Sequence, residues 1–287
     1  MKSFILAARP KTLPAAIVPV WVGCALAFHL TGMWDGALAF YTLMGAVWIQ
    51  LATNFFNDAI DADKGADTAA RIGPVRATAS GRLSRATVYV TACVCLLVAA
   101  VFGYFLYAAR GWPMLVMGLP SFYFAYGYTG GPLPLAYKGL GELFVILFFG
   151  WVAVTGTVFV QTGHWFSEAM VAGLATGCLS AVLISINNLR DVDEDRLHGK
   201  NTLAVKWGRA RSLNLLLVMT AVAYVCGVVL FPLGAGLLYF LPALILGAVI
   251  LRQVSQTLPS PVYNRYLAMA ALQLILFAVA FTFNTCG

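Results

Sequence analysis

Long apolar segments alternate with short polar ones along the 287 residues of the chain. Nine of these segments have about the 20 residues that an α-helix needs to cross the hydrocarbon core of a bilayer. They lie at residues 12–30, 37–57, 87–109, 112–129, 139–161, 166–188, 212–232, 235–252 and 264–284. The pattern predicts an all-α polytopic membrane protein with nine transmembrane helices. No linker, low-complexity tract or soluble domain interrupts it, so residues 1–287 are interpreted as a single transmembrane domain.

Composition agrees with this pattern, since 61% of the residues are hydrophobic and only 10% are charged. Every Lys and Arg except Arg110 lies before the first span or in the connections on one face of the predicted topology. Cytoplasmic loops carry such an excess of bases. We therefore expect a cytoplasmic N-terminus and an outside C-terminus in the inner (cell) membrane of a bacterium. The net charge of +7 then reflects topology rather than nucleic-acid binding.

The first predicted span also has features of a cleaved signal peptide, namely the preceding Lys11 and the small residues at 25–27. Pro14 and Pro19 interrupt that apolar core, so we favour a retained helix. The six cysteines include no CxxC pair and lie mostly inside apolar spans. We predict neither disulfides nor a zinc site.

An acidic cluster follows the sixth predicted span, in the stretch "SINNLRDVDEDRLHGKNT". Asn187, Asp191 and Asp195 are four residues apart there, so on a helix their side chains would lie within a sector of about 80°. The three side chains are therefore expected to face one point.

A second cluster follows the second predicted span and has a similar spacing. Asn57 and Asp61 are four residues apart, and Asp58 lies three residues before Asp61. Asp67 comes shortly afterwards, in what Gly65 indicates is a loop. The two acidic faces could confront each other at the cytoplasmic end of the helix bundle.

Carboxylates this close repel one another at a membrane boundary, so a positive partner is expected. Mg²⁺ typically binds one or two carboxylates and completes its octahedron with water and phosphate oxygens. The interleaved Lys and Arg indicate an anionic guest as well, for which a diphosphate is suited. The alternative is a pair of solvated polar loops in which Asn and Asp form turns. Two such clusters at matching positions on one face favour the binding site.

The two clusters resemble the aspartate-rich motifs of the UbiA superfamily of intramembrane prenyltransferases, and the resemblance extends over nearly the whole chain. Four blocks are similar to the MenA branch, the 1,4-dihydroxy-2-naphthoate polyprenyltransferases. The blocks are "RPKTLP" at 9–14, "DADKGADTAARIGPVR" at 61–76, "YTGGPLPLAYKGLGE" at 128–142 and "INNLRDVDEDRLHGKNTLAVKWG" at 186–208. The first cluster departs from the family pattern at Gly65, so its third acid must be Asp63 or Asp67.

The resemblance implies a bundle of nine helices around a central cavity that opens laterally to the lipid. It implies that a polyprenyl diphosphate binds with its head at the aspartates, and that 1,4-dihydroxy-2-naphthoate is prenylated with loss of its carboxylate in menaquinone biosynthesis. The implied cofactor is Mg²⁺. Its candidate ligands are Asp58, Asp61, Asp67, Asp191 and Asp195.

Other side chains are candidates for substrate contacts. Asn57 and Asn187 accompany the acids, and the bases that could hold the diphosphate are Arg71, Arg76, Lys138, Arg190 and Lys200; we expect Lys138 to be catalytic. Three tyrosines of the run at 122–128 could shield an allylic cation, namely Tyr123, Tyr126 and Tyr128. Such bases are commonly topology signals, and such aromatics commonly form an interfacial belt. His198 could act as a base, although a solvated loop histidine is favoured.

Two alternatives stay open at this point. Paired acidic clusters also suit a divalent-cation transporter, but these acids lie at helix ends rather than at the bilayer midplane and are mixed with bases. Within the superfamily, the acceptor could be another aromatic compound, such as 4-hydroxybenzoate or a chlorophyll or haem precursor.

Overall fold

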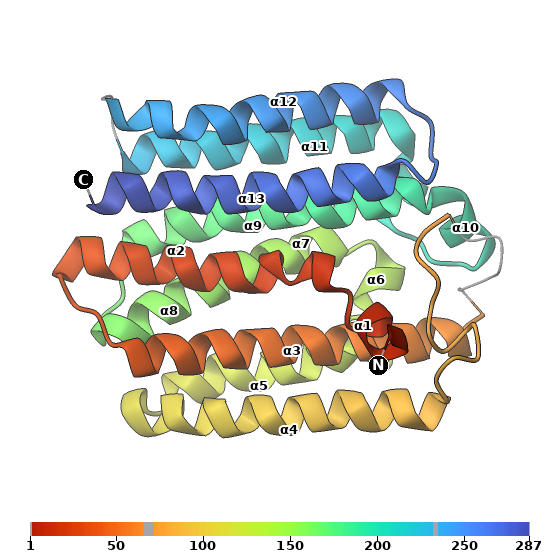
Figure 1. Ribbon diagram of the computed structural model, residues 1–287, viewed down its shortest axis with the longest axis horizontal. Helices are drawn as coiled ribbons and strands as arrows, with labels where there is room; N and C mark the ends of the chain where they lie inside the picture. Colours follow the sequence, from red (N-terminus) through yellow and green to blue (C-terminus); the bar gives the residue numbers. More distant parts are fainter. Residues whose placement is uncertain (1, 66–71, 232–234, 287) are drawn as a thin grey trace.

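The computed structural model describes residues 2–65, 72–231 and 235–286, and every regular element in these ranges is a helix (Figure 1). Eight helical segments are long and apolar enough to cross a membrane. They are α2 (Pro14–Thr31), α3 (Gly36–Asp63), α4 (Arg85–Arg110), the continuous run of α7 (Gly141–Val145), η2 (Ile146–Val152) and α8 (Ala153–Thr162), then α9 (Ser167–Arg190), α11 (Leu203–Leu230), η3 (Ala235–Phe240) with α12 (Leu241–Gln256), and α13 (Tyr263–Cys286). The predicted all-α membrane fold is confirmed.

The fourth predicted span, at 112–129, is the shorter helix α5 (Pro113–Gly127) of 15 residues. Pro113 is suited to a first helical turn. Beyond the other end, Gly131 has φ +71° and turns the chain away from the helical path. α5 lies beside α3 and α4, in line with the other long helices (Figure 1). Nine helical segments therefore form the bundle within the described ranges, eight of them long enough to span by themselves.

Helices α3 and α11 continue past the predicted apolar segments at the polar end of the bundle. α3 runs on to Asp63, and α11 begins at Leu203, with a kink at Gly208, where φ is +74°. Hydropathy marks only the part of a helix that can face lipid, whereas polar residues extend the same hydrogen-bonded helix beyond the bilayer. The extension of α3 carries Asp58 and Asp61 of the first acidic cluster.

Short helices gather at one end of the bundle, together with the N-terminus. They are α1 (Lys2–Ala8), η1 (Pro10–Thr12), α6 (Leu135–Lys138) and α10 (Val192–Leu197). Figure 1 shows α1, α6 and α10 at the right-hand end and the C-terminus at the opposite end. The two chain ends thus lie at opposite ends of the bundle, as an odd number of crossings requires.

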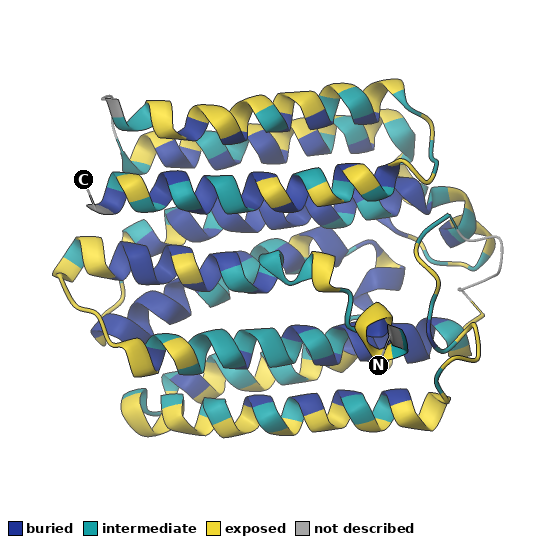
Figure 2. Ribbon diagram, viewed as in Figure 1, coloured by how far each residue is buried: buried dark blue, intermediate teal, exposed yellow. Residues whose placement is uncertain are grey.

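Helix α9 forms the centre of the packing, and it is buried along most of its length, whereas α4 exposes much of its surface (Figure 2). Small residues let η2, a stretch of π-helix, approach α9 closely: a Cβ on Gly177 would lie 2.7 Å from the Ile146 carbonyl oxygen. Large apolar residues such as Leu97 and Val229 are exposed. An apolar surface of this kind is suited to contact with lipid.

Candidate functional site

The second acidic cluster lies at the junction of α9 and α10. Asp191 has a bent, non-helical backbone (φ −95°, ψ 9°) and separates the two helices, so the predicted single helix is interrupted there. The hydrogen bonds nevertheless keep the four-residue spacing, since the Asp191 amide donates to Asn187 (3.1 Å) and the Asp195 amide donates to Asp191 (2.8 Å). Both carboxylates are buried.

The first cluster lies on the last turns of α3, where Asp61 is 3% exposed. The Tyr137 hydroxyl donates a hydrogen bond to Asp61 Oδ1 over 2.9 Å, and Arg76 Nη2 lies 3.8 Å from Asp61 Oδ2. Asn57 Oδ1 accepts a hydrogen bond from the Thr129 hydroxyl. Side chains from three separate parts of the chain therefore converge on the end of α3.

Lys200 connects the two clusters. Its ammonium lies 3.8 Å from Asp61 Oδ2 and 3.7 Å from Asp195 Oδ1. Its side chain is only 14% exposed, which limits screening by water. The structure thus brings Asp61 and Asp195 to one place at the polar end of the bundle.

A small polar pocket of about 40 Å³ lies among these residues. Its polar and charged lining comprises Arg9, Asn57, Asp61, Arg76, Tyr128, Thr129, Glu142, Asn187, Asn188, Lys200 and Thr202. Bases and acids line the same wall, so the pocket is suited to an anionic group that shares a cation with carboxylates.

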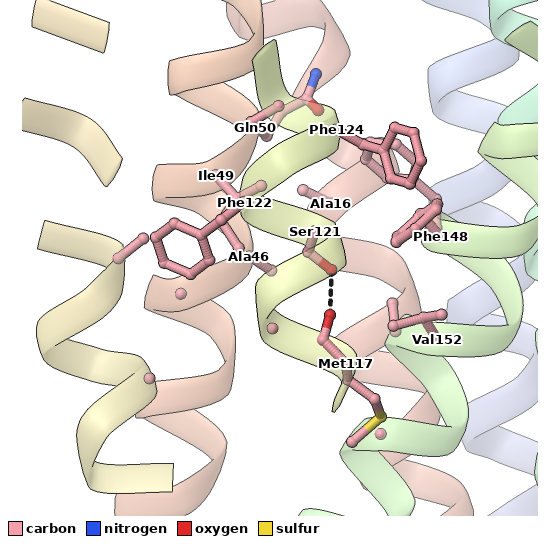
Figure 3. Close-up of a pocket in the computed structure, with 18 of the residues that line it drawn as sticks. Ala16, Ala46, Ile49, Gln50, Met117, Ser121, Phe122, Phe124, Phe148 and Val152 are labelled. Atoms are coloured by element: carbon pink, nitrogen blue, oxygen red, sulfur yellow. Dashed lines mark hydrogen bonds between the residues drawn. The ribbon is translucent and has the colours of Figure 1, made fainter. Parts of the chain in front are cut away.

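A larger apolar cavity of about 220 Å³ lies nearby, between α2, α3, α4, α5 and the α7–η2–α8 run. Figure 3 shows Phe124, Phe148 and Val152 on its wall. The Ser121 hydroxyl donates to the Met117 carbonyl within α5 (2.7 Å), so it needs no partner in the cavity. Tyr128 lines both the cavity and the polar pocket. One elongated guest with an apolar body and an anionic head could occupy the two spaces.

The contacts of Asp58 do not support the predicted metal ligand. Its carboxylate accepts hydrogen bonds from the Ala77 amide (3.1 Å), the Thr78 amide (2.8 Å) and the Thr78 hydroxyl (2.6 Å). Asp58 therefore fastens the segment after residue 72 to α3. Asp63 points elsewhere as well, since it pairs with Arg85 at 2.7 Å and accepts a hydrogen bond from Tyr89. The remaining candidate for a third acid, Asp67, lies outside the described residues, as does Arg71.

Two predicted bases occupy positions other than the pocket wall. Lys138 is exposed, and its backbone carbonyl accepts a hydrogen bond from Lys206 Nζ at 2.6 Å. Arg190 is buried and binds Asp191 through two hydrogen bonds of 2.6 and 2.7 Å. It also donates to Asn187 and Asn264, so Arg190 positions the second cluster.

The aromatic run divides between two environments. Phe122, Phe124 and Tyr128 line the apolar cavity, whereas Tyr123 and Tyr126 are exposed and line neither space. Their alternation follows from the helix, which carries successive residues to different faces. His198 Nδ1 lies 2.9 Å from the Glu194 carbonyl oxygen, within the turn of α10.

Sequence reasoning missed three residues of the site. Arg9 has φ +49°, and it is the one described non-glycine residue with a positive φ; the block "RPKTLP" was the available signal. Glu142 was detectable as an isolated acid beside a long apolar segment. Lys64 donates to the Thr129 carbonyl (2.7 Å) and lies 3.8 Å from the centre of the Tyr137 ring. Desolvation lowers the pKa of its ammonium, Asp61 opposes that shift and Lys200 adds to it.

The site offers carboxylate oxygens as possible ligands for a divalent cation. Over the part of the chain that the structure describes, no three His, Cys, Asp or Glu side chains converge as a metal cage. Asp61 and Asp195 nonetheless offer hard oxygen ligands on either side of Lys200. This arrangement fits Mg²⁺, which usually takes one or two protein carboxylates and shares its remaining positions with phosphate oxygens.

The model of the UbiA prenyltransferase family matches residues 16–265. A 1,4-dihydroxy-2-naphthoate octaprenyltransferase of Escherichia coli is 33% identical over 284 residues, which cover 94% of this chain and 92% of that protein. A protein of the same name from Bacillus subtilis is 35% identical over 227 residues, 79% of this chain and 73% of that one. A UbiA homologue from Archaeoglobus fulgidus, solved bound to DMAPP and Mg²⁺, has the same fold, with a TM-score of 0.67 at 14% identity over 97% of this chain and 99% of that one.

These matches confirm the resemblance seen in the four sequence blocks, and they favour the enzyme over the cation transporter. The family model covers both acidic clusters and every predicted span in full except the first and the last, which it covers in part. The eight long apolar helices agree with the same assignment. The chain belongs to the UbiA prenyltransferase family and is an integral membrane protein.

Proposed function

We propose that this protein transfers a polyprenyl group from a polyprenyl diphosphate to 1,4-dihydroxy-2-naphthoate, releasing the carboxylate as carbon dioxide and giving demethylmenaquinol for menaquinone biosynthesis. The observation that carries the proposal is the polar pocket between two acidic clusters that shares Tyr128 with an apolar cavity. The choice of acceptor rests on the relatives from Escherichia coli and Bacillus subtilis, which carry the name 1,4-dihydroxy-2-naphthoate octaprenyltransferase.

The polar pocket would bind the diphosphate. Mg²⁺ held by Asp61 and Asp195 would supply positive charge for the departing diphosphate oxygens. Arg9, Arg76 and Lys200 line or border the same space and add fixed cations for the outer oxygens. Arg190 takes part indirectly, because its two hydrogen bonds hold the Asp191 carboxylate in place.

The apolar cavity would hold the first isoprene units of the chain. The Phe124 ring lies 4.8 Å from the Phe144 ring and 5.3 Å from the Phe148 ring, centre to centre. All three rings line the cavity. Their faces stabilise positive charge that develops on the allylic carbons and exclude water that would capture the cation. The electron-rich ring of the acceptor then attacks the same carbon.

The polar end of the bundle would face the cytoplasm in a bacterial cell membrane. It holds the N-terminus and the basic connections, and such bases are enriched on the cytoplasmic side. The diphosphate head group and the acceptor, which are both anionic, would then meet at the membrane surface that faces the cytoplasm.

The test is a labelled-acceptor assay with purified protein. Dihydroxynaphthoate labelled in its carboxyl carbon should lose the label as carbon dioxide in step with diphosphate release, and chelation of Mg²⁺ should stop both. 4-Hydroxybenzoate should give little product. Diphosphate release with the label retained in the lipid product would refute the acceptor, and preferred use of 4-hydroxybenzoate would reassign it.

A further inference from the structure

Glu142 is a buried acid, 4% exposed, at the start of α7 on the wall of the polar pocket. Its Oε1 accepts hydrogen bonds from Asn188 Nδ2 (3.0 Å) and from the Ser185 hydroxyl (3.3 Å), both on α9. Its Oε2 is enclosed and has no hydrogen-bond partner among the described residues. The carboxyl group is therefore held by one oxygen only.

An enclosed polar atom without a partner is costly. Leaving a buried acceptor unsatisfied costs the hydration that it loses on burial, and natural structures contain few such atoms. An acid at the edge of a membrane helix usually marks a functional site. Since two donors of α9 hold Oε1, Oε2 is the oxygen that can receive a donor from a guest in the pocket.

Glu142 also lies at the border between the two spaces. A Cβ on the neighbouring Gly141 would lie 2.9 Å from the Tyr128 hydroxyl oxygen, so the glycine is what lets Tyr128 approach the start of α7. Tyr128 belongs to both walls. A prenyl diphosphate that spans pocket and cavity would place its reacting carbon near this border, and the acceptor ring has to be there too.

The chemistry of Oε2 restricts its guest. A carboxylate repels phosphate, for which Arg9, Arg76 and Lys200 already line the pocket. The divalent cation of the proposed function is already assigned to Asp61 and Asp195, on either side of Lys200. A neutral O–H donor satisfies Oε2 and brings no further charge into the pocket.

We propose that Glu142 binds the aromatic acceptor, with Oε2 accepting a hydrogen bond from a ring hydroxyl. This inference rests on the proposed function, since it assigns a residue to the acceptor of that reaction. A hydrogen bond to a charged oxygen is about twice as strong as a neutral one. It orients the ring and increases the electron density that attacks the allylic carbon.

The test compares two ligands and two proteins at equilibrium, without turnover. 1-Hydroxy-2-naphthoate and 1-methoxy-2-naphthoate have the same ring, but only the first can donate to Oε2. Wild-type protein with Mg²⁺ should bind the hydroxy compound about tenfold more tightly than the methoxy compound. In Glu142→Gln the amide can keep its oxygen toward Asn188 and present an NH₂ group, which donates instead of accepting. The preference should then fall to about twofold or less.

Glu168→Gln is the matched control, because it makes the same change on a partly exposed residue at the other end of the bundle. It should keep the full hydroxyl preference. In turnover assays Glu142→Gln should raise the KM for dihydroxynaphthoate and leave the KM for the prenyl diphosphate unchanged. If Glu142→Gln does not fold, Glu142→Asp keeps the charge but retracts it, and an intermediate preference is expected.

The outcomes separate the two proposals. Wild-type protein that forms no product from dihydroxynaphthoate refutes the proposed function. Wild-type protein that forms the product, combined with an undiminished hydroxyl preference in Glu142→Gln or Glu142→Asp, refutes the role of Glu142. A change in Mg²⁺ dependence in place of acceptor affinity also overturns it, because Glu142 would then serve the cation.

Discussion

The two acidic clusters share a four-residue spacing from Asn to Asp in the sequence but have different surroundings in the structure. On α3, Asp61 lies in the centre of the site, while Asp58 is occupied by the amides and hydroxyl of Ala77 and Thr78. At α9–α10, Asp191 is held by Arg190 and Asp195 faces Lys200. Each cluster thus combines an acid that faces the other cluster with an acid that organises its own element. Acidic residues in one motif should not be expected to share one role.

The largest expected loss of activity is at Asp61 and Asp195, which face each other across Lys200, and not at Asp193, which points outward. Asp61→Asn and Asp195→Asn should each lower kcat/KM by at least about hundredfold, close to 3 kcal/mol of transition-state stabilisation. Each substitution removes a carboxylate that would hold the cation, and that cation neutralises the diphosphate. Asp193→Asn is the control, since Asp193 is 78% exposed and pairs with Arg196 on the surface. Its activity should change by less than about threefold. Equal losses of kcat/KM in Asp193→Asn and Asp195→Asn would contradict the distinction between facing and outward acids.

A smaller effect is expected at the base that joins the clusters. Lys200→Met should raise the KM for the prenyl diphosphate by about tenfold, since it removes one charge-assisted contact to the phosphate oxygens. Lys138→Met tests the other predicted base, which is exposed and outside the pocket wall. Initial rates at varied prenyl diphosphate concentration measure both. A larger rise in this KM for Lys138→Met than for Lys200→Met would support the predicted catalytic role of Lys138 at the diphosphate.

The smallest effect on catalysis is expected at Asp58. Asp58→Asn weakens three hydrogen bonds to the segment at Ala77 and Thr78, so it should destabilise the protein by about 1–3 kcal/mol. At temperatures where the variant stays folded, kcat/KM should fall by less than about fivefold. Thermal unfolding in detergent, read beside initial rates, distinguishes the two effects. An unchanged Tm with a hundredfold loss of activity would return Asp58 to the metal site.

Local features of the sequence were sufficient to predict the membrane-spanning helices and the position of the site. Apolar runs locate the spans, and a four-residue spacing places Asn57 with Asp61, and Asn187 with Asp191, without knowledge of the rest of the chain. The hydrogen-bond partners of Asp58 could not be predicted in this way, because they depend on how the segment after residue 72 folds back onto α3. Lys138 and Lys200 show the same limit. Both follow apolar segments, and only the path of the chain brings one of them between the acids.

The ends of the helices were likewise only partly predictable from the sequence. The apolar runs of α3 and α11 end well before the helices do, since backbone hydrogen bonds continue through polar residues. The break at Asp191 lies in a stretch whose spacing is fully helical, and nothing in the local residues marks it. Arg9 is held in a left-handed backbone conformation that its residue type does not favour, so its place in the pocket depends on tertiary packing.

Tyr128 lines both the polar pocket and the apolar cavity, and this shared wall affects which lipids can bind. An inorganic diphosphate can fill the polar pocket but gains nothing from the apolar cavity, and an isoprenoid alcohol does the reverse. A molecule in which head and tail are covalently joined binds the second space at the high effective concentration created by the first. Under the proposed function, selection would therefore depend on the covalent link between head and tail: neither half needs to bind tightly for the whole amphiphile to be retained, and the separated halves are free to leave.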